Sequence, residues 1–319
     1  MIFDVFNGDA DGICALQQLR LAKPLETSLI TGIKRDIKLL DKISPHQGDT
    51  VNVLDISMDK NKAALLQMLD SGISVTYFDH HMAGEIPTHP NLQAFIDPTP
   101  DVCTSLLVNA YLQGQHLAWA VTGAFGDNLY DSAVRVAKPL ALSENEMNAL
   151  RELGTCINYN GYGASIDDLF FPPDELFKKL HPYANPLDFI ASDPAFKILQ
   201  DGYAEDLHHA DKLQPELEES RIALYVLPDE KWARRIAGVF ANQLARQTPS
   251  RAHALLSEKS DGGFQVSVRS PLENKTGADK LCSQFPTGGG RQAAAGINHL
   301  ESTHFDNFVA AFRSTFNPV

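Results

Sequence analysis

The chain has 319 residues, of which 44 % are hydrophobic, so it is long enough for two domains and can bury a sizeable core. Its formal net charge of −13 disfavours long nucleic acid as a partner, because the chain as a whole repels a polyanion. Four scattered cysteines without a CxxC pair, together with the lack of a signal-like N-terminus or a long apolar run, lead us to expect a cytoplasmic protein with no membrane partner.

The first part of the chain alternates between short apolar runs and amphipathic stretches. Strands are predicted at Ile2–Phe6, Val51–Leu54 and Ser74–Phe78, and helices at 13–21 and about 60–69. This alternation favours a parallel sheet with crossover helices. Acidic residues lie just past the last apolar residue of each strand, and open parallel sheets form their active sites at that carboxyl edge.

The middle of the chain is predicted to be mainly helical. Apolar residues at helical spacing indicate helices over 105–112, 117–125, 129–137 and 144–157, the last preceded by the cap-like Ser143. Residues 161–185 are rich in glycine, proline and aromatic residues, so we expect irregular structure there. Residues 186–213 are predicted to be helical again.

After Pro215 the alternation of strands and helices resumes. The pattern predicts strands at 222–227, 252–257 and 264–269, helices at 232–246, 278–283 and 304–316, and a turn at 288–290. We therefore predict an α/β protein. It comprises a parallel-sheet N-terminal domain (1–190) with crossover helices, a helical linker (191–220) and a smaller C-terminal α/β domain (221–319).

The first predicted strand is followed by a polar segment, Asn7-Gly8-Asp9-Ala10-Asp11-Gly12. Its alternating oxygen-bearing side chains can chelate a cation. A calcium loop of the EF-hand type does not fit, because Gln18 stands where that loop needs a bidentate glutamate and because a strand precedes the segment. Taken alone, the segment can also be a strand-to-helix turn with Asp11 as the helix cap.

Three further acidic segments follow the predicted strands and helices. Asp55 ends the second strand and, by itself, could be an ordinary capping aspartate. Asp79-His80-His81 is more specific, because it places a carboxylate and two imidazoles at one strand end. The other adjacent pair, His208-His209, is expected on a solvated helix face. Asp127 follows the helix predicted at 117–125.

These segments, in this order, resemble the motifs of the DHH phosphoesterase family, and the resemblance covers essentially the whole chain. The four motifs of that family are similar to Asp9-Ala10-Asp11-Gly12, Asp55, Asp79-His80-His81 and Gly126-Asp127. The C-terminal part resembles the DHH-associated domain through Val266-Ser267-Val268-Arg269-Ser270 and Gly288-Gly289-Gly290, followed by Ala293-Ala294-Ala295-Gly296.

The resemblance implies a centre of two divalent cations. Its ligands would be Asp55 bridging both ions, Asp9 on the first ion, and Asp11, His80 and Asp127 on the second. Asp79 and His81 are the expected catalytic residues, which would lie either behind the metal ligands or near the scissile phosphate, orienting ligands and donating a hydrogen bond.

The ligand types favour Mn²⁺, with Mg²⁺ as the alternative, because hard oxygen donors combined with imidazole suit these ions. Two such ions about 3.5–4 Å apart can activate a water molecule and neutralise charge on phosphorus. Many family members carry a histidine or an extra aspartate shortly before the Asp-x-Asp pair, where this chain has Val5 and Asn7. This departure bears on the first ion, although Asn7 still offers a neutral carbonyl oxygen.

The second domain is expected to bind the substrate. The backbone of Gly288-Gly289-Gly290 could approach a phosphate closely, the alternative being a flexible turn before a helix. Arg291 stands where relatives commonly have a histidine, and it can hold a phosphate with two hydrogen bonds or stack on a base. Arg269 is a second candidate, for the non-scissile phosphate. It could instead be an ordinary edge-strand arginine.

The resemblance implies hydrolysis of a small phosphoester. Our preferred hypothesis is cleavage of short linear oligonucleotides, above all 5′-phosphorylated dinucleotides such as pGpG, to mononucleotides. A cleft with one or two phosphate-binding arginines suits such a ligand. Alternatives are a nucleotide 3′-phosphatase acting on phosphoadenosine phosphate, a cyclic-dinucleotide phosphodiesterase, and a nucleotide-binding protein without turnover, which Val5 and Asn7 suggest. The oligomeric state does not follow from the sequence, so a homodimer stays open.

Overall fold

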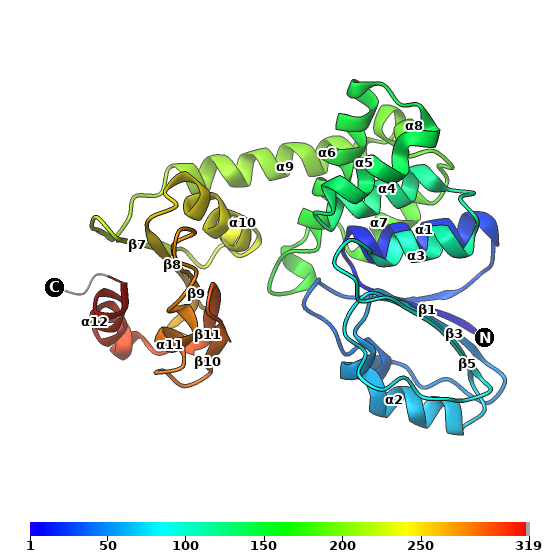
Figure 1. The fold of residues 1–319 in the computed structure, drawn as a ribbon, viewed down its shortest axis with the longest axis horizontal. Coiled ribbons are helices and arrows are strands. Elements are labelled where there is room, and N and C mark those ends of the chain that lie inside the picture. The colour runs from blue at the N-terminus through cyan, green and yellow to red at the C-terminus, as the bar shows by residue number, and fades with distance from the viewer. Residues whose placement is uncertain (317–319) are drawn as a thin grey trace. The chain divides into compact units, whose positions relative to one another are not determined.

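The computed structural model describes residues Met1–Phe316. Its contacts divide the chain into two compact units, residues 1–203 (unit 1) and residues 204–319 (unit 2). The helix α9 (Pro194–Asp211) runs across this boundary and lies within the segment predicted as a helical linker (Figure 1).

Unit 1 contains a sheet of five parallel strands in the order β2-β1-β3-β4-β5. The strands are β1 (Ile2–Phe6), β2 (Ser28–Ile30), β3 (Thr50–Leu54), β4 (Ser74–Asp79) and β5 (Leu92–Ile96). The parallel sheet is confirmed, and β1, β3 and β4 coincide with the three predicted strands. The edge strands β2 and β5 were not predicted. Both are only half-buried, so their sequences lack the apolar runs that mark the central strands.

Helices cover both faces of this sheet. Phe6, Leu54 and Phe78 pack in one apolar cluster with α1 (Ala10–Ala22), while their strand neighbours Val53 and Tyr77 pack on the opposite face with α2 (Met58–Asp70). Figure 1 shows α1 and α3 on one side of the strands and α2 on the other. Burial on both faces explains why the central strands are apolar at consecutive positions.

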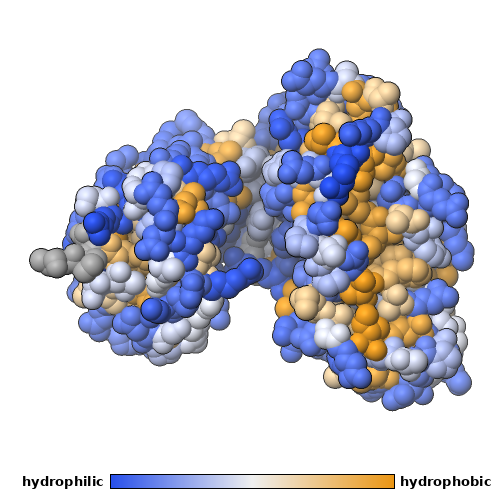
Figure 2. Space-filling model, viewed as in Figure 1, coloured by the Kyte–Doolittle hydropathy of each residue, from blue (hydrophilic) through white to orange (hydrophobic). Residues whose placement is uncertain are grey.

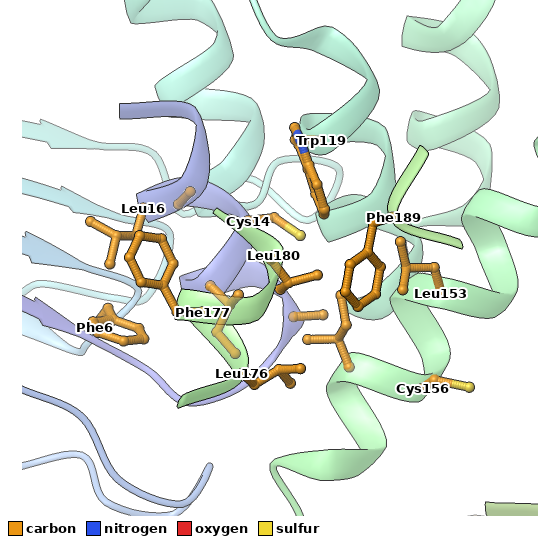
Figure 3. Packing of buried hydrophobic residues seen from close by; sticks show 14 of the residues in the cluster. Phe6, Cys14, Leu16, Trp119, Leu153, Cys156, Leu176, Phe177, Leu180 and Phe189 are labelled. Carbon is orange, nitrogen blue, oxygen red and sulfur yellow. The ribbon is translucent and has the colours of Figure 1, made fainter. Parts of the chain in front are cut away.

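A helical layer extends the α1 side of the sheet. It consists of α3 (Thr104–Tyr111), α4 (Leu117–Gly126), α5 (Tyr130–Ala137), α6 (Glu144–Asn160), α7 (Pro173–Leu180) and α8 (Pro186–Ser192). Helix α6 begins with the predicted cap, because Ser143 and Glu146 form a reciprocal capping box. Figure 3 shows Leu16, Trp119 and Phe177 among the side chains of the core that joins these helices.

Two predictions for this layer were wrong. Residues 161–185, predicted to be irregular, contain α7, whose amphipathic pattern is short and begins at a proline. The helix predicted over 186–213 is divided into α8 and α9. Pro194 causes the division, because Asp193 before it adopts an extended conformation and ends α8.

Unit 2 contains a six-stranded sheet in the order β10-β11-β9-β8-β7-β6, in which only β7 and β8 are parallel. Its strands are β6 (Leu217–Glu218), β7 (Ile222–Leu227), β8 (Ala252–Glu258), β9 (Phe264–Arg269), β10 (Gly288–Arg291) and β11 (Ala294–Leu300). Its helices are α10 (Lys231–Gln247), α11 (Ala278–Cys282) and α12 (Phe305–Phe316). A smaller second α/β domain is thereby confirmed.

The turn predicted at Gly288–Gly290 was wrong. These glycines begin β10, which pairs antiparallel with the unpredicted strand β11. Alanine and glycine dominate the start of β11, and both have low strand propensity, so pairing across the sheet decides the conformation here.

Short 3₁₀ helices connect some of these elements, at Leu39–Lys42, Lys138–Leu140, Ile166–Asp168 and Ser302–His304. All four cysteines of the chain are buried and unpaired. Among the described residues, no helix combines the length and apolar character that crossing a membrane requires. Figure 2 shows hydrophilic residues over much of the viewed surface, with apolar residues gathered on unit 1.

Candidate metal centre

The strand order of unit 1 brings the predicted metal ligands to one sheet edge. From β1 the chain crosses to β2 on one side, whereas β3 pairs with the other side of β1. Such a reversal leaves a crevice at the carboxyl ends of the two strands, where open α/β sheets bind ligands. Asp9 and Asp11 follow β1, Asp55 follows β3, and Asp79 ends β4, so all four lie at this edge.

Asp11 is held rigidly by the start of α3. Its two carboxylate oxygens accept hydrogen bonds from the backbone amides of Thr104 and Ser105, each at 2.7 Å. Gly12 allows the tight turn that places Asp11, because a Cβ at this position would lie 2.3 Å from the carbonyl oxygen of Asn7. Thr104 and Ser105 were not predicted as site residues. Their backbone amides, which leave no residue-type signal, bind the Asp11 carboxylate, and Ser105 Oγ also donates to the Asp11 carbonyl oxygen at 2.8 Å.

Asp55 occupies the centre of the cluster and has a strained backbone. Its φ of 59° lies in the left-handed region, which is uncommon for a residue other than glycine and often marks functional sites. Oδ1 accepts a hydrogen bond from Thr104 Oγ1 at 3.1 Å. Burial, and then the charges of Asp9 and Asp11, raise the pKa of Asp55 well above its ordinary value. A bound cation would relieve this repulsion.

His80 directs one ring nitrogen at three carboxylates. Nδ1 lies 3.0 Å from the carbonyl oxygen of Val102, so Nδ1 carries a proton and Nε2 is the nitrogen that can bind a metal ion. Nε2 lies 3.4 Å from Asp55 Oδ1, 3.7 Å from Asp127 Oδ2 and 4.0 Å from Asp11 Oδ2. Burial opposes a charged ring, but these carboxylates raise the pKa of His80 to about 10. The same field favours a metal cation.

Asp127 ends α4 and completes this side of the cluster. Burial, followed by the charges of Asp11 and Asp9, raises the pKa of Asp127 to about 7. The ligand atoms of Asp11, His80 and Asp127 all lie within 4.8 Å of one another, as do those of Asp55, His80 and His81. Oxygen donors with imidazole are the ligand set that Mn²⁺ and Mg²⁺ accept, so each group fits a divalent cation. Both groups use His80, whose Nδ1 is already bonded to Val102, so His80 can bind only one ion.

Asp79 and His81 form a hydrogen-bonded pair at the border of the cluster, with His81 Nδ1 4.0 Å from Asp55 Oδ1. Asp79 is fully buried, and its Oδ1 lies 2.6 Å from His81 Nδ1 and 3.2 Å from the His81 backbone nitrogen. The second oxygen of Asp79 accepts from the amide of Met58 at 3.4 Å. Asp79 therefore fixes the orientation of His81, whose side chain is 46 % exposed, and leaves its Nε2 for a partner outside the protein.

Lys34 lies beside Asp9, and it was not predicted as a site residue. Its Nζ lies 2.6 Å from Asp9 Oδ2. Burial alone would raise the pKa of Asp9, but the charge of Lys34 and its hydrogen bond hold that pKa below its ordinary value. Lys34 follows the edge strand β2, so missing that strand also hid the residue. No residue-type pattern in the sequence around Lys34 marks it as a site residue.

The predicted substrate-binding arginines share one face of the sheet in unit 2. Arg269 on β9 and Arg291 on β10 both pair with Ala294 of β11, one from each side. Directly paired residues lie on the same face of a sheet, so Arg269 and Arg291 share a face. They are two strands apart, and each strand spacing is about 5 Å. Arg269 is anchored by Asn242 Oδ1 at 2.9 Å and Ser267 Oγ at 3.0 Å, whereas Arg291 is exposed.

The three predicted glycines lie in the edge strand β10. Alternate amides of an edge strand point away from the sheet, so backbone donors face outward here. At Gly288 an added Cβ would lie 1.9 Å from the carbonyl oxygen of Cys282, whereas at Gly289 it would meet no atom within 4 Å. Gly290 has a φ of 143°, which favours glycine. The backbone at Gly289 is therefore open to close approach by a ligand.

Comparison with known proteins places the fold. Neither a scan of family models nor a search of curated proteins finds a match to the chain. Among solved structures, exonuclease RecJ bound to manganese is 16 % identical with a TM-score of 0.63, and the match covers 98 % of this chain and 89 % of that one. RecJ from Thermus thermophilus in complex with Mn²⁺ is 18 % identical with a TM-score of 0.61. That match covers 98 % of this chain and 51 % of the RecJ chain, so this chain spans about half its length.

CDC45 from Entamoeba histolytica is also similar, with 10 % identity, a TM-score of 0.56 and coverage of 99 % of this chain and 95 % of that one. The chain shares the fold of these RecJ and CDC45 structures. This agrees with the α/β architecture and with the resemblance of the motifs. At these identities the likeness establishes the fold, so chemistry must be argued from the site.

Proposed function

We propose that this protein is a metal-dependent phosphoesterase that hydrolyses short linear oligonucleotides to mononucleotides. 5′-Phosphorylated dinucleotides such as pGpG are its main proposed substrates. Mn²⁺ is the proposed ion, with Mg²⁺ as the alternative. The observation that carries the proposal is the orientation of His80, whose Nε2 faces Asp11, Asp55 and Asp127 at 3.4–4.0 Å while Nδ1 is held by Val102. Two fold neighbours are RecJ structures with bound manganese, one of them named as an exonuclease, which supports the same reaction class.

A bound divalent cation would lower the pKa of a coordinated water and neutralise charge on the phosphoryl oxygens. Asp11, Asp55, His80 and Asp127 are the residues that would hold it. The backbone amides at the start of α3 fix Asp11, and Thr104 Oγ1 fixes Asp55, so these ligands are positioned before any ion binds. Preorganised ligands of this kind reduce the cost of binding the ion in the correct geometry.

His81 is the proposed proton donor to the leaving group. In hydrolysis the water oxygen forms a bond to phosphorus, the bond from phosphorus to the 3′ oxygen breaks, and that oxygen takes up a proton. The Asp79 carboxylate accepts from Nδ1–H and favours the imidazolium form of His81, in which Nε2 also carries a proton that it can give to the departing oxygen. The partial exposure of His81 is consistent with a group that meets substrate.

The preference for a short substrate rests on charge and on the arginines of unit 2. With a net charge of −13, the chain disfavours long polyanionic strands. Arg269 and Arg291 lie on one face of the sheet and are separated by Ala294, so they offer localised positive charge for a terminal phosphate. We therefore propose a short phosphorylated nucleotide as the only nucleic-acid partner and no membrane partner. A homodimer remains an open alternative.

The substrate assignment is tested by incubating the protein and Mn²⁺ with a panel of phosphoesters. The panel contains 5′-phosphorylated dinucleotides, an oligonucleotide of about ten residues, phosphoadenosine phosphate and cyclic dinucleotides, with EDTA as the control. We expect mononucleotides from the dinucleotides and little turnover of the longer strand. Inorganic phosphate from phosphoadenosine phosphate, without dinucleotide cleavage, would replace this proposal with a nucleotide 3′-phosphatase. Products from the cyclic dinucleotides alone would replace it with a cyclic-dinucleotide phosphodiesterase.

A further inference from the structure

The carboxylate of Asp9 has different surroundings from the other predicted metal ligands. Its Oδ1 accepts hydrogen bonds from the amides of Asp11 and Gly12, each at 3.1 Å, and its Oδ2 lies 2.6 Å from Lys34 Nζ. Both oxygens therefore already have partners. Among the described residues, neither group of ligand atoms close enough to share a cation includes Asp9. A metal ion between Asp9 and Asp55 would have to displace the ammonium group of Lys34.

Lys34 is built into this position by several contacts. Its Nζ donates to Asn158 Oδ1 at 2.8 Å and lies 5.8 Å from the centre of the Tyr162 ring. Its backbone nitrogen donates to the carbonyl oxygen of Gly161 at 2.9 Å. The side chain is only 27 % exposed. These contacts from the end of α6 fix both the backbone and the ammonium, unlike those of a surface lysine that meets a carboxylate by chance.

The residues before Asp9 add no negative charge to this position. Val5 is apolar and Asn7 is neutral. The side-chain oxygen of Asn7, Oδ1, is buried without a hydrogen-bond partner. Asp9 and Lys34 therefore neutralise each other locally. Divalent cations in proteins are held mainly by anionic oxygen ligands. At the first metal position that ligand would be Asp9, and its carboxylate is already paired with the fixed positive charge of Lys34. The first of the two metal positions implied by the family resemblance does not fit these residues.

We propose that the Lys34 ammonium takes the place of the first metal ion and that this protein works with a single divalent cation. The ligands of that cation are Asp11, Asp55, His80 and Asp127. The inference deepens the proposed function and rests on it, because Lys34 is assigned a role in the same phosphoester hydrolysis.

Lys34 would contribute a fixed charge to the reaction. An ammonium has three N–H donors, and the ion pair with Asp9 and the hydrogen bond to Asn158 account for two of them. The third is available for a phosphoryl oxygen. A positive charge held in place before the reaction stabilises negative charge that develops on such an oxygen, which is part of what a second metal ion otherwise provides.

The number of bound ions tests this assignment without any turnover. The full-length wild-type protein is equilibrated with excess Mn²⁺ by dialysis, the bound metal is counted, and the electron paramagnetic resonance spectrum is recorded. We expect one Mn²⁺ per chain and the signal of isolated ions. Two ions per chain, or the signal of an exchange-coupled pair, would overturn the assignment while leaving the proposed function intact.

Two variants test the charge of Lys34. Lys34→Ala removes the charge, and Lys34→Arg keeps it, while both retain the four proposed metal ligands. With a 5′-phosphorylated dinucleotide and saturating Mn²⁺, we expect kcat to fall about 100-fold in Lys34→Ala and less than about 10-fold in Lys34→Arg. Retention of bound Mn²⁺ by each variant shows that the site is still folded. Wild-type kcat in a Lys34→Ala protein that binds one ion would overturn the role of the lysine.

The two proposals fail in different ways. A wild-type protein that binds one Mn²⁺ per chain but hydrolyses none of the tested phosphoesters would contradict the proposed function. The same result would leave the single-ion assignment supported, because the ion count does not depend on turnover.

Discussion

The ring of His80 has a hydrogen-bond acceptor beside one nitrogen and three carboxylates near the other, an arrangement that suits a cation ligand. Val102 engages Nδ1, and three carboxylates surround Nε2. The sequence could indicate that His80 and Asp55 follow neighbouring strands, because residue type and strand ends are visible in it. The hydrogen bond that selects the tautomer was not predictable, because it depends on a backbone carbonyl more than 20 residues away.

Lys34 shows a second limit at the residue scale. A lysine after an edge strand carries no chemical signature, and its role follows from the approach of α6 to the start of α1. The same holds for Thr104 and Ser105, which act on Asp11 through backbone amides. By contrast, carboxylates and imidazoles at strand ends are informative because few structural roles need them there.

The pKa values of the cluster predict how pH affects the metal-free protein. The pKa of Asp127 is raised from 3.8 to about 7, by burial first and then by Asp11 and Asp9, and the pKa of His80 is raised from 6.5 to about 10. Between the ordinary and the raised values the folded state binds more protons than the unfolded state, so stability falls as pH rises. In EDTA we expect the midpoint of urea unfolding to decrease from pH 5 to pH 9.

The control for this pH dependence removes the Asp127 carboxyl group and keeps His80. Asp127→Asn should make the decrease between pH 5 and pH 7 shallower. It should also weaken the decrease above pH 7, because Asp127 is one of the carboxylates that raise the pKa of His80. Saturating Mn²⁺ should reverse the trend, because the ion competes with protons for the same ligands. A midpoint that rises with pH in EDTA would contradict the assigned burial and charge of this cluster.

At the scale of elements, central strands and long amphipathic helices were predictable, and elements defined by pairing were not. The apolar runs of β1, β3 and β4 reflect the burial of these strands on both faces of the sheet. A strand that is buried on both faces needs apolar residues at consecutive positions. The strands β10 and β11 form from Gly288-Gly289-Gly290 and an alanine-rich segment, whose conformation depends on the partner strand. Local composition there indicates a turn, and only long-range pairing makes it a strand.

The crossing of α4 and α6 positions the end of α4, where Asp127 lies. An added Cβ at Gly154 would lie 2.3 Å from the carbonyl oxygen of Thr122 and 2.9 Å from the nitrogen of Gly126. We expect Gly154→Ala to reduce the free energy of unfolding by about 1–3 kcal/mol, because the backbones must separate. It should also weaken Mn²⁺ binding through displacement of Asp127. Urea unfolding and Mn²⁺ titration measure the two effects.

Gly238 provides the opposite case. It lies inside α10, and an added Cβ would meet no atom within 4 Å. Gly238→Ala should therefore stabilise unit 2 by about 0.4–1 kcal/mol, because alanine restricts the unfolded chain and favours the helix. Equal effects of the two substitutions would show that the close approach at Gly154 does not hold the helices together.

At the scale of the whole molecule, the proposed chemistry and the proposed substrate recognition fall in different units of the chain. All the proposed metal ligands lie in unit 1, and the two arginines proposed to bind phosphate lie in unit 2. The two-domain α/β organisation was predictable because the alternation of strands and helices is interrupted by a long helical stretch. The chain shares the fold of RecJ and CDC45 at 10–18 % sequence identity, so the arrangement of elements is similar where the sequences differ.

The central claim is that the cluster around His80 is a metal-dependent hydrolytic site. The most direct measurement compares wild type, His80→Ala and the control His208→Ala, whose histidine is exposed on α9. Each is incubated with a 5′-phosphorylated dinucleotide in Mn²⁺ or in EDTA, and mononucleotide release is followed by chromatography. We predict turnover only with Mn²⁺, unchanged in His208→Ala and at least about 100-fold lower in His80→Ala. Turnover in EDTA, or wild-type turnover in His80→Ala, would contradict the account.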